Sequence, residues 1–151
     1  MTPVTGSESD LRALCRRAGL DVLAHGNLNE SRTAADAWRP VIAGHAVPTV
    51  AIRHDRPDLV AELNRQWHRL AIERSVIGPD GEFLINIAGH GCRPVWCDHW
   101  TQVRLTGLWD LAGVLGPRPG EPEFVTISLD GDNVLGATTE EYDVWLIAVH
   151  R

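Results

Sequence analysis

The feature that most constrains this chain is its division into short segments with two different hydrophobic periods. Apolar residues three and four positions apart predict helices in four segments: 7–18, 33–39, 55–73 and 106–115. Alternation of apolar and polar residues predicts strands at 48–53, 82–88, 95–105, 123–129 and 142–150, with a further short strand through Val76. The order, rich in turn residues, predicts an α+β fold: a mostly antiparallel sheet of about five or six strands, with three or four helices packed mainly on one face.

Capping and breaking signals predict where three of the helices begin and where one of them ends. Thr33, with Asp36 three residues later, has the spacing of a capping box, and Pro40 is expected to end that helix. Asp55 is expected to cap the longest helix, in which the side chain of Glu62 lies on the polar face and points toward solvent. At the fourth helix we expect Thr106 to be the cap.

The length of the chain predicts a single domain, and its lack of lysine excludes several kinds of catalysis. A chain of 151 residues, 44% of them hydrophobic, is long enough to bury a core by itself, so we expect a single domain over residues 1–151. All 14 basic residues are arginine, and the chain contains no lysine. Schiff-base chemistry on a lysine and phosphate binding by a P-loop lysine are therefore excluded.

The net charge and the hydropathy pattern of the chain predict its location in the cell and the partners that it does not bind. The acidic net charge of −6 repels phosphate backbones, so we expect no nucleic-acid partner. No apolar run approaches the roughly 18 residues that span a bilayer, and residues 1–10 lack the pattern of a secretory signal. We therefore expect a soluble cytoplasmic protein that does not enter a membrane.

One local motif combines residues that bind metals or perform acid–base chemistry. Residues 90–99 read His-x-Cys-x4-Cys-x-His, formed by His90, Cys92, Cys97 and His99. A hairpin that pairs Cys92 with Cys97 places His90 opposite His99, and the same register places Leu84 opposite Leu105 and Asn86 opposite Val103. All four side chains then share one face and offer the two sulfurs and two nitrogens that tetrahedral zinc accepts.

Other interpretations of this motif stay open. A bulge at the neighbouring glycines moves His90 to the other face, and the two cysteines can also be core residues or form a disulfide. Alternatively, one of the two cysteines, Cys97 or Cys92, is a nucleophile activated by His90 or His99, with Asp98 or Asn86 orienting the imidazole.

The remaining titratable residues are interpreted structurally. We expect Cys15 to be a core residue on the apolar stripe of the first helix. His25 and His45 are expected in solvated loops, and the carboxylates of Glu140, Glu141 and Asp143 on a solvated loop face.

Two functions follow from these observations. The first is a small cytosolic enzyme or small-molecule-binding protein with a His/Cys-centred site at residues 90–99, assisted by a metal such as zinc. The second is a non-catalytic partner-binding module, such as an acidic immunity or inhibitor protein, which the negative charge and six tryptophans favour. The motifs of serine hydrolases, dinucleotide-binding enzymes and zinc proteases are absent from the sequence.

Overall fold

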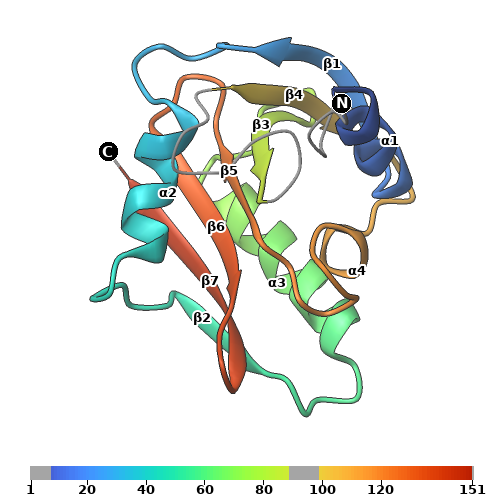
Figure 1. The fold of residues 1–151 in the computed structure, drawn as a ribbon, viewed down its shortest axis with the longest axis vertical. Coiled ribbons are helices and arrows are strands. Elements are labelled where there is room, and N and C mark those ends of the chain that lie inside the picture. The colour runs from blue at the N-terminus through green and yellow to red at the C-terminus, as the bar shows by residue number, and fades with distance from the viewer. Residues whose placement is uncertain (1–7, 89–98, 151) are drawn as a thin grey trace, which may run out of the picture.

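A computed structural model describes residues 8–88 and 99–150 of the chain (Figure 1). Within these ranges the fold is one antiparallel sheet of seven strands, in the order β1-β4-β3-β5-β6-β7-β2, with four helices. The strands are β1 (Leu20–Gly26), β2 (Val50–Arg53), β3 (Glu82–Ile87), β4 (Trp100–Leu105), β5 (Phe124–Ile127), β6 (Asn133–Thr139) and β7 (Asp143–His150). The helices are α1 (Glu8–Arg17), α2 (Ala34–Ile42), α3 (Leu59–Glu73) and α4 (Leu111–Val114). The predicted α+β class and antiparallel sheet are confirmed.

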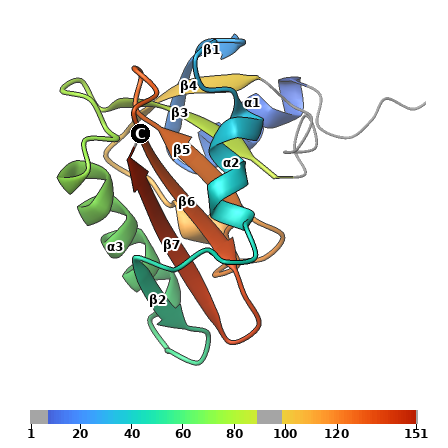
Figure 2. The same ribbon diagram turned by 90° about the vertical axis from the view of Figure 1, so that its left-hand side faces the viewer.

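The helices cover the two faces of the sheet unequally. Three of them, α1, α3 and α4, pack on one face, where they contact a core that includes Phe83 and Ile85 of β3 and Val103 of β4. The fourth, α2, packs on the other face, where Trp38 contacts a cluster that includes Leu84 and Trp100. Figure 2 shows α2 and α3 on opposite sides of β6 and β7. The prediction that most helices share one face is therefore confirmed.

The strand count exceeds the prediction because two strands carry weak sequence signals. In β1 the pairing with β4 shifts between Val22 and Ala24, which breaks the alternation of apolar residues. In β6 the small residue Gly136 weakens the signal, yet it is required, because a Cβ there would lie 2.7 Å from the side chain of Val41. The strand predicted at Val76 is wrong, since this residue lies buried in the loop after α3.

The capping box of α2 is confirmed, but the predicted end of that helix is wrong. The Thr33 hydroxyl accepts a hydrogen bond from the Asp36 backbone N–H, and the Asp36 carboxylate accepts one from the Thr33 backbone N–H. The helix continues through Pro40 to Ile42. Pro40 lies in the last turn, where its missing N–H removes a single helical hydrogen bond, and the burial of neighbouring Trp38 and Val41 outweighs that loss.

The predicted cap of α4 is also wrong, because Thr106 is used elsewhere. Its hydroxyl donates a hydrogen bond to the carbonyl of Gly19, while Asp110 caps α4 by accepting one from the Gly113 backbone N–H. At Gly19 the backbone has φ +81° and lies against residues 108 and 109 so closely that a Cβ has no room. This contact ties the end of α1 to the loop before α4.

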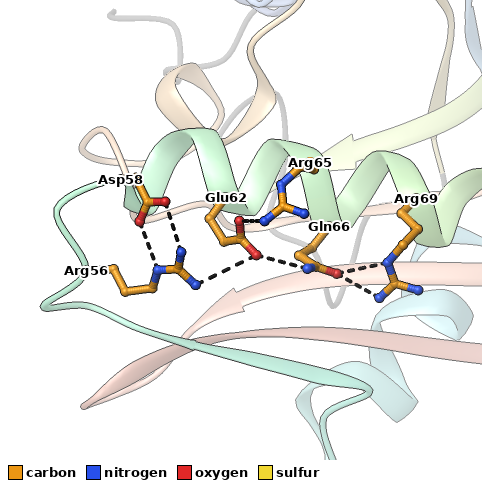
Figure 3. Close-up of polar contacts among 6 residues, drawn as sticks. All are labelled: Arg56, Asp58, Glu62, Arg65, Gln66 and Arg69. Atoms are coloured by element: carbon orange, nitrogen blue, oxygen red, sulfur yellow. Dashed lines mark hydrogen bonds and ion pairs between the residues drawn. The ribbon is translucent and has the colours of Figure 1, made fainter.

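The longest helix, α3, differs from the prediction at its N-terminus and on its polar face. Its N-cap is Asp58 rather than Asp55, and the Asp58 carboxylate binds the Arg56 guanidinium through two hydrogen bonds of 2.9 Å. Glu62 was expected in solvent, but it is only 6% exposed. It accepts hydrogen bonds from Arg65 and Gln66 and forms an ion pair with Arg56 (Figure 3).

These contacts make α3 sensitive to acid. The hydrogen bond from Gln66, followed by that from Arg65, lowers the pKa of Glu62 below its ordinary value. A carboxylate whose folded pKa is lowered stabilises the fold above its unfolded pKa, and this stabilisation is lost as the pH falls through the folded value.

We therefore expect Glu62→Gln to lower the melting temperature at pH 7, with the difference from the unmodified protein shrinking below pH 4. The matched control is Glu73→Gln on the same helix, whose pair with Arg69 is solvent-exposed and should contribute little. Thermal unfolding followed by circular dichroism across this pH range measures both. A Glu62→Gln effect as small as that of the control would contradict this role.

No helix within residues 8–88 and 99–150 has the length and apolar character needed to cross a membrane.

Candidate functional site

Of the residues in the predicted site, His99 lies in the described part of the chain. His90, Cys92, Cys97 and Asp98 lie outside the described residues, so their predicted roles stay predictions. His99 immediately precedes β4, and Ala88 immediately follows β3. The ends of these two strands therefore define the part of the sheet next to the motif.

The register predicted for this hairpin is wrong. Leu84 pairs with Gln102 and Phe83 with Val103, whereas the hypothesis placed Leu84 opposite Leu105. The reason is burial, since the observed register brings Phe83 and Val103 to the same face, where both contact the core under α1 and α3. The shift from the predicted register is three residues, an odd number, and the observed register therefore gives no support for four ligand-type side chains on one face.

The structure instead places a different histidine beside His99. His25 was expected in a loop, but it lies in β1 and pairs with Thr101 of β4. Its Nδ1 lies 3.0 Å from the Thr101 hydroxyl, and its ring centroid lies 5.5 Å from that of His99, with the two rings nearly perpendicular at 88°. Sequence reasoning missed this pair because the bulge in β1 hid the strand that carries His25.

A buried amide holds the backbone of His99 in place. Asn86 is 6% exposed, and its Oδ1 accepts a hydrogen bond of 2.8 Å from the indole N–H of Trp38 in α2. The Asn86 Nδ2 donates to the carbonyl of His99 over 3.1 Å. Next along the chain, the indole of Trp100 donates to the carbonyl of Arg32. Helix α2, strand β3 and the loop before α2 together therefore fix the start of β4.

The centroid separation of the two imidazoles is close to that of two histidines that bind one metal ion. With Zn–N bonds of 2.0–2.1 Å and tetrahedral angles, the centroids of two coordinating imidazoles lie about 5 Å apart, close to the separation of His25 and His99. Within residues 8–88 and 99–150 there is no group of three or more metal-binding side chains, so a metal held by these two imidazoles would need further ligands from outside those ranges.

The cysteine in the described residues is structural. Cys15 of α1 is fully buried in the core, as predicted, and burial raises the pKa of its thiol to about 11. A thiol with this pKa stays protonated at neutral pH and is a poor nucleophile. A reactive or metal-binding thiol is therefore not expected at this position.

Comparison of the chain with protein-family models, curated proteins and solved structures found no match. The site itself is therefore the basis for a functional proposal.

The bridge from Trp38 through Asn86 to His99 can be tested by stability. We expect Asn86→Ala to lower the free energy of unfolding by about 2–4 kcal/mol, because it leaves the buried indole N–H and the His99 carbonyl without this partner. Trp38→Phe removes the indole donor together with part of the buried ring, and the double variant should show coupling of about 1 kcal/mol between the two positions. Urea unfolding of the four proteins measures this coupling, and strictly additive losses would contradict the bridge.

Proposed function

We propose that this protein is a small-molecule-binding protein or enzyme of the cytoplasm with a metal-assisted, histidine-centred site. The observation that supports it most is the pair of imidazoles of His25 and His99, with Thr101 orienting one ring. In metal sites, a histidine ligand commonly uses its second ring nitrogen for a hydrogen bond that fixes its orientation. The contact between His25 and Thr101 has this form.

The remaining ligands in this proposal are those that the sequence predicts. Cys97 is two residues from His99 in the sequence, and Cys92 and His90 belong to the same motif. Nitrogen and thiolate ligands together favour zinc. Among the residues proposed for catalysis, His99 binds the metal in this proposal. Proton transfer is then left to Asp98 and to whichever of Cys97 and His90 does not bind the metal.

The number of protein ligands decides between a binding and a catalytic role. Four protein ligands form a closed structural site, whereas three leave a position for water or substrate. A metal held with such an open position would lower the pKa of a bound water and supply a nucleophile, so hydrolysis is the reaction class that the site would support.

The partner-binding module has weaker support. Leu108 is 92% exposed and Val47 is 76% exposed, but they belong to different loops. Single exposed apolar residues are common on protein surfaces and do not by themselves mark an interface.

Metal binding is the direct test of the proposed site. We expect protein purified without an affinity tag to bind about one equivalent of Zn²⁺ or Co²⁺, measured by elemental analysis and by the visible absorption of bound Co²⁺. His25→Gln and His99→Gln should each reduce the affinity at least tenfold. His45→Gln, at an exposed loop position, is the matched control and should change nothing.

A second variant separates orientation of His25 from loss of the fold. Thr101 is 2% exposed, and Thr101→Val keeps its shape while removing the hydroxyl that contacts His25. We expect a 10- to 100-fold loss of metal affinity, the range found for residues that orient metal ligands. Unchanged metal affinity in all three variants, with the fold retained, would rule out this site.

A further inference from the structure

A cavity of about 280 Å³ lies at the C-terminal end of α2, away from the two histidines. Figure 2 shows this end of α2 over β6 and β7. One wall is apolar and is formed by Val41 and Ile42, the last residues of the helix. The floor comes from the sheet and is formed by Glu123, Thr138, Glu140 and Trp145. The cavity therefore combines an apolar and aromatic side with an acidic one.

The fold fixes the positions of the polar residues in this floor. Thr138 of β6 pairs directly with Trp145 of β7, so their side chains are neighbours on one face. The Thr138 hydroxyl donates a hydrogen bond of 2.9 Å to the Glu140 carboxylate. The Glu123 carboxylate accepts one of 2.8 Å from the backbone N–H of Thr139. Both carboxylates are thus anchored by the end of β6.

The charges in this cavity are unbalanced. Burial raises the pKa of Glu123, the hydrogen bond from Thr139 opposes this change, and the negative charge of Glu140 raises the pKa further. No arginine or histidine belongs to the described residues that line the cavity. A cation placed between the two carboxylates would relieve this repulsion.

We propose that this cavity binds a small organic cation of the alkylammonium class. The ammonium group lies between Glu123 and Glu140, and its alkyl part contacts Trp145 and Ile42. An indole face attracts a cation and also offers apolar surface, and the C-terminal end of a helix adds partial negative charge. A bare Ca²⁺ or Mg²⁺ ion uses none of the apolar wall, and it takes at least six oxygen ligands, waters included.

The test uses the full chain and the n-butylammonium ion as the probe, followed by the NMR signals of the tryptophan indoles. We expect saturable shifts of the signal that Trp145→Phe removes. Glu123→Gln should weaken binding at least tenfold, about 1.4 kcal/mol. The glutamine oxygen can still accept the hydrogen bond from Thr139, so the fold should be retained, which circular dichroism checks.

The control is Glu30→Gln, which removes the same charge from an exposed loop and should leave binding unchanged. The neutral analogue 1-butanol should bind at least tenfold more weakly than n-butylammonium. Equal binding of the two compounds, equal affinity in Glu123→Gln, no saturable binding, or binding of Ca²⁺ in place of the ammonium would each overturn the proposal. Because neither histidine lines this cavity, these results are independent of the metal site.

Discussion

The burial of β3 on both faces is the constraint on which the rest of the structure depends. Phe83 and Ile85 contact the core under α1, α3 and α4, while Leu84 contacts the core under α2. A strand buried on both sides cannot slip by one residue without exchanging its two sets of side chains. This burial fixes the pairing of β3 with β4, and through β4 it places Thr101 beside His25 of β1.

Local signals allowed much of the fold to be predicted. The capping box of Thr33 and Asp36 depends on neighbouring residues alone, and the sequence predicted it correctly. The buried position of Glu62 depends partly on Arg56, which forms an ion pair with it from the loop before α3. Helical periodicity cannot predict this contact, because Arg56 lies outside the helix. The register of β3 against β4 likewise depends on which residues the helices cover.

The candidate site was predictable only in part, for the same reason. The motif at residues 90–99 is local and visible in the sequence, but its proposed geometry rested on a hairpin register that the structure corrects. The contact of His25 with His99 joins residues far apart in the sequence, through a strand whose bulge conceals it. His99 is therefore the single residue at which the sequence motif and the observed imidazole pair coincide.

The most direct test of the central claim is anomalous X-ray diffraction, at the zinc absorption edge, from crystals grown with one equivalent of zinc. We expect a single strong peak about 2.0–2.1 Å from one ring nitrogen of His25 and one of His99. A zinc ion bound elsewhere at full occupancy, with the two imidazoles in contact only with each other and with protein, would contradict it.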